Sequence, residues 1–289
     1  MKKVLIITYY WPPAGGSGVQ RWLKFTKYLP KYDWKPIVYT PENPYFEVKD
    51  EALLDDIPFE AEVWKTPIWE PYTLKDKLFG KGERSQSAGV ITNKKSLKNK
   101  VLNWVRGNVF IPDPKIYWVK PSVKVLLKKI KEEGVEHIVT TGPPHSMHLI
   151  GLGLKKAMPP LKWIADFRDP WSELDLLDEF NLSSSSTKKH KDLEKEVLQT
   201  ADVALTVSET WVDDLKRLGG GRVELITNGY DAADFELKPK TNNEFIIGHY
   251  GLLNHLRNPK NLWKALADLC TDKSDFNNLY INLLEVFLP

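Results

Sequence analysis

The chain opens with an apolar strand, a glycine turn and an amphipathic helix, and this order limits the possible folds most. Val4–Tyr9 is a continuous apolar run, which is typical of a strand buried on both faces of a sheet. The turn PPAGGSG follows, and apolar residues then recur at helical spacing between Val19 and Leu29. Ile37–Tyr39 predicts a second strand. A strand, a crossover helix and a second strand form a βαβ unit, which requires a parallel sheet.

Strands and helices continue to alternate, so the predicted fold is a doubly wound, Rossmann-like α/β domain over residues 1–240. Its later strands are expected at Glu62–Lys65, His137–Thr141, Trp163–Phe167, Val203–Val207 and Val223–Thr227. Its later helices are expected at Leu102–Val109, Lys120–Lys131, His145–Lys156, Lys188–Thr200 and Glu209–Leu218. The polar stretch ELKPKTNNE then predicts a linker.

Residues 241–289 predict the first βαβ unit of a second Rossmann-like domain. Its elements are a strand at Phe245–His249, a helix at Pro259–Cys270 and a further strand at Tyr280–Leu284. A unit of this size buries too little apolar surface to be a stable domain alone.

Composition excludes several classes of protein. No apolar run approaches the roughly 18 residues that a membrane-spanning helix needs. The first apolar run is too short for a signal peptide, and no small-residue cleavage site follows it. Cys270 is the single cysteine, which excludes an intramolecular disulfide, and we expect it to be buried on its helix. These features favour a cytoplasmic protein.

Positive charge is concentrated in one part of the chain. The whole chain carries a net charge of +3, but Lys75–Lys131 holds fifteen Lys and Arg against three acidic residues, a local balance of +12. Four aromatic residues lie among these charges: Trp104, Phe110, Tyr117 and Trp118. The pattern predicts peripheral contact with an anionic membrane surface, and a solvated insertion is the alternative. Nucleic acid is disfavoured as a partner because no reader motif accompanies the charges.

The unusual residues of the chain follow its predicted strands. GGSG follows the first strand, GPPH the fourth, DFRDPW the fifth and NGYD the last. Ligands of doubly wound sheets bind outside the carboxyl ends of the strands. We therefore expect the functional site at this edge.

The glycine turn contains Gly15, Gly16 and Gly18, between a strand and a helix. Such a turn exposes backbone N–H groups at a helix N-terminus, where a phosphate is stabilised. A dinucleotide oxidoreductase is disfavoured because the glycine spacing is not GxGxxG. The second strand also ends in Thr40 and Pro41 rather than an acidic residue. A plain tight turn remains the alternative.

Five segments in order carry a resemblance to a known family. They are KVLIITYYWPPAGGSGVQRWLKFTKYL, TTGPPHSMHLIGLGLKK, WIADFRDPW, ITNGYDAADF and IGHYGLLNHLRNPKNLWKAL. From about Lys2 to Leu269 the chain resembles the family 4 retaining glycosyltransferases of the GT-B fold. The subgroup with DFRDPW is similar to enzymes of bacterial surface-polysaccharide synthesis. The resemblance implies retaining transfer of a hexose from a nucleotide sugar to a glycan or lipid-linked acceptor, without a bound metal or other cofactor.

The resemblance also implies roles for residues of the two domains. Residues 1–240 would bind mainly the acceptor, and the second domain mainly the nucleotide sugar. Backbone groups at Gly15, Gly16 and Gly18, together with Arg257, would bind the diphosphate. The family's first basic residue is replaced by Leu252 here, and His255 is a partial substitute.

Three residues are candidates for catalysis under this resemblance. His145 ends a strand and is expected to point toward the interdomain cleft. Arg168 and Asp169 occupy the place of a histidine–aspartate pair, and Asp169 is expected to orient Arg168 through a bidentate pair. Asp166 and Asn228 are expected to line the acceptor side of the cleft or, for Asn228, to shape the hinge. A helix-cap histidine without a role and a structural ion pair are the alternatives.

The acidic pair that binds the donor sugar in the family has no counterpart before Pro289. We therefore expect a truncated second domain, impaired catalysis and weak binding of nucleotide sugar. The rival hypothesis is a non-catalytic α/β module that binds an anionic membrane or glycan through its basic segment.

Overall fold

The computed structural model describes residues 1–46, 48–70, 97–174, 177, 180–235, 244–251, 253, 258–272 and 279–284. The chain divides into two compact units, Met1–Gly229 and Tyr230–Pro289. The predicted domain boundary at residues 240 and 241 falls outside the described residues and stays a prediction.

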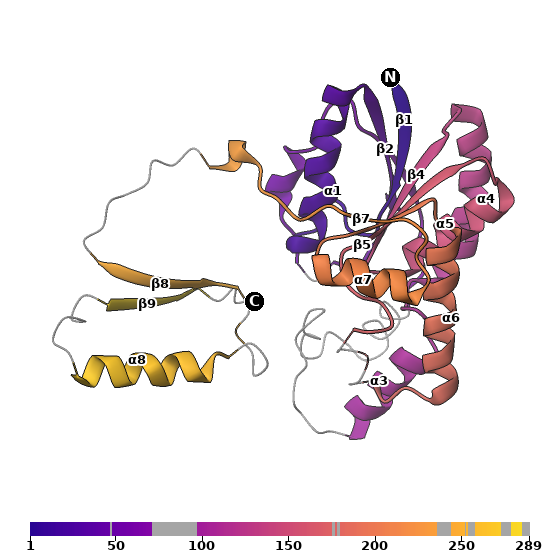
Figure 1. Cartoon of the computed structure of the whole chain (residues 1–289). Coiled ribbons are helices and arrows are strands. Elements are labelled where there is room, and N and C mark those ends of the chain that lie inside the picture. The colour runs from indigo at the N-terminus through magenta and orange to yellow at the C-terminus, as the bar shows by residue number, and fades with distance from the viewer. Residues whose placement is uncertain are drawn as a thin grey trace. The chain divides into compact units, whose positions relative to one another are not determined.

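The first unit contains a seven-stranded sheet in the order β3-β2-β1-β4-β5-β6-β7 (Figure 1). The strands are β1 (Lys2–Ile7), β2 (Trp34–Pro41), β3 (Glu62–Thr66), β4 (His137–Gly142), β5 (Lys162–Phe167), β6 (Val203–Thr206) and β7 (Val223–Leu225). Every pairing between neighbouring strands is parallel. The predicted doubly wound α/β fold is confirmed. Because the chain leaves β1 in one direction and returns to β4 on its other side, the topological switch point lies between β1 and β4.

Helices cover both faces of this sheet. The described helices of the first unit are α1 (Ser17–Tyr28), α3 (Leu97–Asn108), α4 (Ile116–Glu133), α5 (Ser146–Ala157), α6 (Ser184–Thr200) and α7 (Glu209–Leu218), with short 3₁₀ turns at Leu29–Tyr32 and Glu51–Leu54. Figure 1 shows α1 on one face, and α4 and α5 on the other.

Alternate residues of β1 enter two separate cores. Val4 and Ile6 pack with residues of α1 such as Leu23, whereas Leu5 and Ile7 pack with residues of α4, α5, α6 and α7. Side chains that alternate between the two faces of a strand explain this division. The uninterrupted apolar run of β1 is therefore a consequence of helices on both sides.

Trp118 does not belong to the basic surface, contrary to the sequence prediction. Its side chain is only 1% exposed, and its ring stacks on Tyr39 with 4.9 Å between centroids. Its indole nitrogen donates a hydrogen bond to Thr66. Trp118 shares the inner face of α4 with Ser122 and Leu126, four and eight residues later, so helical spacing buries it.

The second unit contains the predicted βαβ arrangement. Strands β8 (Phe245–Tyr250) and β9 (Leu279–Leu284) pair in parallel, and α8 (Lys260–Asp272) connects them in sequence. Cys270 is exposed on α8, so the expectation that it is buried was wrong. Leu252, His255 and Arg257 lie outside the described residues. In the described parts of both units, no helix is long and apolar enough to cross a membrane.

Candidate functional site

The carboxyl ends of β1, β4 and β5 bring three of the sequence-predicted segments together in the first unit. The glycine turn follows β1, the GPPH segment follows β4, and Arg168 directly follows β5. These ends adjoin the switch point, where doubly wound sheets bind their ligands.

Gly16 begins the first helix of the chain. Its φ of 85° and ψ of −178° lie in a region that is essentially restricted to glycine. No side chain caps α1, and its first turn contains no acidic residue. The N–H groups of this turn and the positive end of the helix dipole are therefore available to an anion. Gly15 is different, because its N–H already donates to the Val48 carbonyl at 2.9 Å.

Arg168 joins the two sides of the switch point. Its terminal nitrogens donate hydrogen bonds to the carbonyls of Gly18, at 2.6 Å, and Pro143, at 2.5 Å. The predicted bidentate pair with Asp169 does not form, because backbone carbonyls take both nitrogens. Burial lowers the pKa of the Arg168 guanidinium, and the carboxylates of Asp166 and Asp169 oppose this shift. Arg168 thus fixes the glycine turn relative to the segment after β4.

His145 lies inside the first unit rather than on an open face. Its side chain is 7% exposed, and its ring stacks on Trp171 with 5.0 Å between centroids and 7° between planes. Neither ring nitrogen is in hydrogen-bond geometry, although the Pro170 carbonyl is close enough to influence the ring. Burial lowers the pKa of the His145 imidazole to about 3, so the ring is neutral at physiological pH.

His148 continues this stack of rings. Its ring lies 4.4 Å from that of Phe167 between centroids, and its Nδ1 is 2.8 Å from the Thr140 hydroxyl. Burial lowers the pKa of His148 well below its ordinary value. A Cβ at Gly142 would lie 2.7 Å from His148 Nε2 and 2.8 Å from His145 Nδ1, so only glycine fits between the two rings.

Asp166 is fully buried and takes part in a structural network. It accepts two hydrogen bonds from Arg21, at 3.1 and 3.2 Å, one from Trp22 at 2.7 Å and one from Thr141 at 3.0 Å. Arg21 also donates to the Asn228 side chain at 3.1 Å and so joins α1 to the segment after β7. Asp166 therefore has no exposed surface for an acceptor. Sequence reasoning missed Arg21, although its charge complements an aspartate at the same sheet edge.

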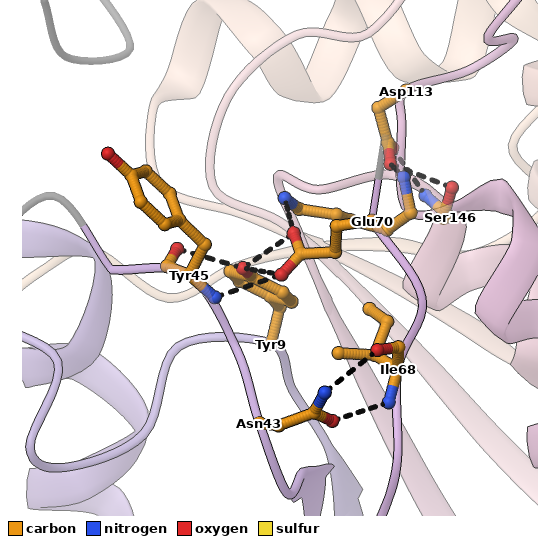
Figure 2. Close-up of polar contacts among 8 residues, drawn as sticks. Tyr9, Asn43, Tyr45, Ile68, Glu70, Asp113 and Ser146 are labelled. Carbon is orange, nitrogen blue, oxygen red and sulfur yellow. Dashed lines mark hydrogen bonds and ion pairs between the residues drawn. The ribbon is translucent and has the colours of Figure 1, made fainter. Parts of the chain in front are cut away.

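A second network clamps the segments after β1, β2 and β3 (Figure 2). The Tyr9 hydroxyl lies 2.9 Å from Glu70 Oε1 and 3.0 Å from the Tyr45 carbonyl, and it shares its one proton between them. Glu70 also accepts from the Tyr45 N–H at 2.9 Å and forms an ion pair with Lys115. Burial and the charge of Glu70 raise the pKa of Tyr9 above its ordinary value. Sequence analysis identified no member of this clamp.

Two further contacts in Figure 2 extend the clamp. Asn43 exchanges two hydrogen bonds with the backbone of Ile68, at 2.8 and 3.1 Å. Asp113 accepts from the N–H and the hydroxyl of Ser146, both at 2.8 Å, where α5 begins. Both contacts fix loops at the carboxyl edge of the sheet.

An exposed aromatic patch, formed by Trp69, Phe110 and Tyr117, adjoins the clamp. Trp69 and Tyr117 make an edge-to-face contact with 5.0 Å between centroids, and Phe110 lies 6.1 Å from Tyr117. Trp69 is 52% exposed and Tyr117 is 49% exposed. Trp69 directly precedes Glu70, and Tyr117 follows Lys115 by two residues, so the patch lies next to the buried ion pair in sequence.

Metal ligands are not grouped in the described part of the chain. No set of three or more His, Cys, Asp or Glu side chains is arranged there to hold an ion.

Comparison with known proteins identifies the fold. No protein-family model matches the chain, and no curated protein matches its sequence. Among solved structures, a mutant of Staphylococcus aureus TarM in complex with fondaparinux, α-GlcNAc-glycerol and UDP matches with a TM-score of 0.54 and 11% identity. That match covers 99% of this chain and 72% of the TarM chain. The N-terminal domain of Candida albicans trehalose-6-phosphate phosphatase matches with a TM-score of 0.55 and 10% identity, over 99% of this chain and 64% of that one.

The fold is that of the GT-B glycosyltransferases. Identities of 10% and 11% show this fold alone. The predicted Rossmann-like architecture is confirmed, whereas membership of family 4, the retaining mechanism and the site roles stay predictions.

Proposed function

We propose that this chain works as the acceptor-side part of a glycosyltransferase. The enzyme would move a hexose, with retention, from a nucleotide sugar to a glycan or lipid-linked acceptor in surface-polysaccharide synthesis. The observation that carries this proposal is the uncapped N-terminus of α1 at Gly16, beside the switch point of a GT-B fold. The UDP present in the TarM structure supports a nucleotide diphosphate as the ligand class.

The negative charge that develops in the proposed reaction matches the N–H groups at the start of α1. The sugar C1–O bond to the diphosphate breaks, a C1–O bond to the acceptor hydroxyl forms on the same face, and the acceptor proton leaves. Negative charge grows on the departing diphosphate, and preorganised N–H groups stabilise such charge. We assign that role to the first turn of α1, while Arg168 keeps the glycine turn in place.

Asp169 is the proposed contact to the donor or acceptor, whereas the buried ring of His145 is proposed to support the GPPH segment from inside the first unit. Asp169 is exposed at the end of the DFRD segment.

Release of nucleotide diphosphate tests the enzymatic proposal. The chain would be incubated with a panel of uridine and guanosine diphosphate sugars, with and without lipid-linked and glycan acceptors. We expect slow release from one donor, which an acceptor accelerates and which Arg168→Ala reduces. Release from no donor above the uncatalysed rate would contradict the proposal.

The second candidate function is docking on an anionic membrane. The exposed rings of Trp69 and Tyr117 favour it, because aromatic side chains anchor proteins at the headgroup level and neighbouring cations add attraction. Sedimentation with anionic and neutral vesicles would measure it. We expect Tyr117→Ala, inside the basic segment, to weaken binding to anionic vesicles, whereas Tyr32→Ala, at a ring that is 74% exposed outside the basic segment, leaves binding unchanged. Equal binding to both kinds of vesicle, or none at low salt, would exclude this function.

A further inference from the structure

A small pocket opens at the carboxyl ends of β5 and β6, next to α6 and α7. Its volume is about 110 Å³, which corresponds to roughly four water-sized groups. Phe167, Trp211 and Leu215 give it an apolar wall. The pocket is formed within the first unit and is separate from the N-terminus of α1.

Four carboxyl groups line this apolar space: Asp169, Glu173, Glu194 and Asp214. Glu173 and Asp214 share a single cation, because Arg217 donates to both, at 2.8 and 3.0 Å. Glu194 forms no ion pair among the described residues, and its Oε2 accepts from the Ser172 N–H at 3.1 Å. The lining therefore holds more negative than positive charge.

The two most deeply buried polar residues of the lining lack hydrogen bonds that they should have. Thr206 is 0% exposed and Glu194 is 1% exposed. Thr206 Oγ1 and Glu194 Oε1 have no partner in hydrogen-bond geometry among the described residues, although the Ser172 hydroxyl and the Trp171 backbone are close enough to Glu194 to influence its pKa. A buried polar atom without a partner costs free energy, so each is expected to have one when the protein functions. Both orphaned atoms can accept a hydrogen bond.

We propose that this pocket binds a primary ammonium group on a short aliphatic stem. The ammonium donates to Glu194 Oε1 and Thr206 Oγ1, while the stem packs on Trp211, Phe167 and Leu215. An ammonium has three donors and no acceptor, which matches two orphaned acceptors in an acidic lining. A metal ion fits less well, because the described residues offer no group of three metal-ligating side chains in suitable geometry.

The electrostatics of the pocket lining favour a cationic ligand. Burial raises the pKa of the Glu194 carboxyl. A bound cation would favour the ionised form of this group and would oppose the shift. The inference does not depend on the proposed glycosyl transfer, because binding can be measured without a reaction.

Calorimetric titration of the full chain with n-butylammonium tests the proposal, and n-butanol serves as the neutral analogue of the same length. We expect saturable binding of the amine in the millimolar range and no saturable binding of the alcohol. Equal binding of the two probes, or no binding of the amine at tens of millimolar, would overturn it.

Two pocket variants and one matched control locate the binding. Glu194→Gln keeps the shape and an acceptor for Ser172 but removes the charge, and we expect at least about tenfold weaker binding. Leu218→Trp, at the partly exposed end of α7, should block the pocket and abolish binding. Asp213→Asn removes an exposed carboxylate of α7 outside the lining and should change nothing. Unchanged affinity in Leu218→Trp would contradict the site even if Glu194→Gln fails to fold.

Discussion

At the scale of single residues, Asp166 lies in a sequence motif that predicts a functional site, but in the structure its side chain stabilises the fold. Four hydrogen bonds reach its carboxylate from Arg21, Trp22 and Thr141, and none of its surface is exposed. Asp166→Asn would leave the buried guanidinium of Arg21 without its counter-charge, and we expect a loss of about 3–5 kcal/mol in the free energy of unfolding. Urea denaturation would measure it.

A matched control comes from the exposed helix pair Lys188–Asp192. Asp192→Asn should change stability by at most about 0.5 kcal/mol, because exposed ion pairs are screened by water. Similar losses in the two variants would mean that the Asp166 network has no structural role.

Stability should also depend on pH through three buried histidines, His145, His148 and His190, because burial lowers the pKa of each. Burial holds the pKa of His145 at about 3 in the folded chain, whereas histidines of the unfolded chain protonate near pH 6.5. As the pH falls from about 6.5 toward 3, the unfolded state binds protons that the folded state does not. Each histidine then lowers the free energy of unfolding by up to about 1.4 kcal/mol per pH unit.

His145→Phe keeps a ring against Trp171 and removes one of these titrations. We expect stability of the variant to fall less steeply below pH 6.5 than that of the unaltered chain, by up to about 1.4 kcal/mol per pH unit. The raised pKa of Glu194 acts in the opposite direction, because the folded state then binds the extra proton, and this effect cancels in the comparison. Parallel pH profiles would show that His145 protonates while the chain is folded.

At the scale of elements, Gly16 determines the path of the chain between β1 and α1. Its φ of 85° and ψ of −178° are strained for any residue with a side chain, so Gly16→Ala should cost about 1–3 kcal/mol. Gly221 has neither a positive φ nor a neighbour within 4 Å of a new Cβ, so Gly221→Ala should be nearly neutral. Thermal unfolding of both variants would compare them, and equal melting temperatures would refute the strained turn.

The clamp around Glu70 holds the loops at the carboxyl edge of the sheet in place. Glu70→Ala would remove the carboxylate that accepts from the Tyr9 hydroxyl and the Tyr45 N–H and that pairs with Lys115. We expect faster hydrogen exchange at the Tyr45 amide, which donates to Glu70, and unchanged exchange in β4. Unaltered exchange at Tyr45 would mean that other contacts hold the loop.

Most elements could be predicted from the sequence because their signals are local. The period of the apolar residues placed α7 at Glu209–Leu218, as observed. The start of α6 was missed by four residues, because Ser183 caps it through a bond to the Ser186 N–H and a run of serines carries no apolar period. Trp118 was assigned to the surface from the charges around it, although its spacing to Leu126 places it on the inner face of α4.

At the scale of the whole molecule, the fold was predictable and the detail of the site was not. A parallel sheet follows from repeated βαβ units, which need only short-range patterns. The partners of Arg168 and Asp166, in contrast, are Gly18 and Arg21, 150 and 145 residues away in sequence. Such pairs depend on how the strands are brought together. The motifs therefore indicated the carboxyl edge of the sheet as the candidate site, but they did not show which charged side chains there are already paired within the fold.

The central claim is that the first turn of α1 receives a diphosphate, and a charge placed in that turn tests it most directly. Ser17→Asp would put a carboxylate in a turn that has none, which should repel a diphosphate while leaving the helix as stable or more so. Ser17→Asn is the uncharged control of the same size.

Saturation-transfer NMR titrations with UDP, GDP, uridine and guanosine would measure the binding, even where it is weak. We expect the diphosphates to bind at least about tenfold more tightly than the nucleosides to the unaltered chain and to Ser17→Asn. We expect Ser17→Asp to lose this preference. Diphosphates that bind no better than nucleosides, or a preference that survives in Ser17→Asp, would contradict the central claim.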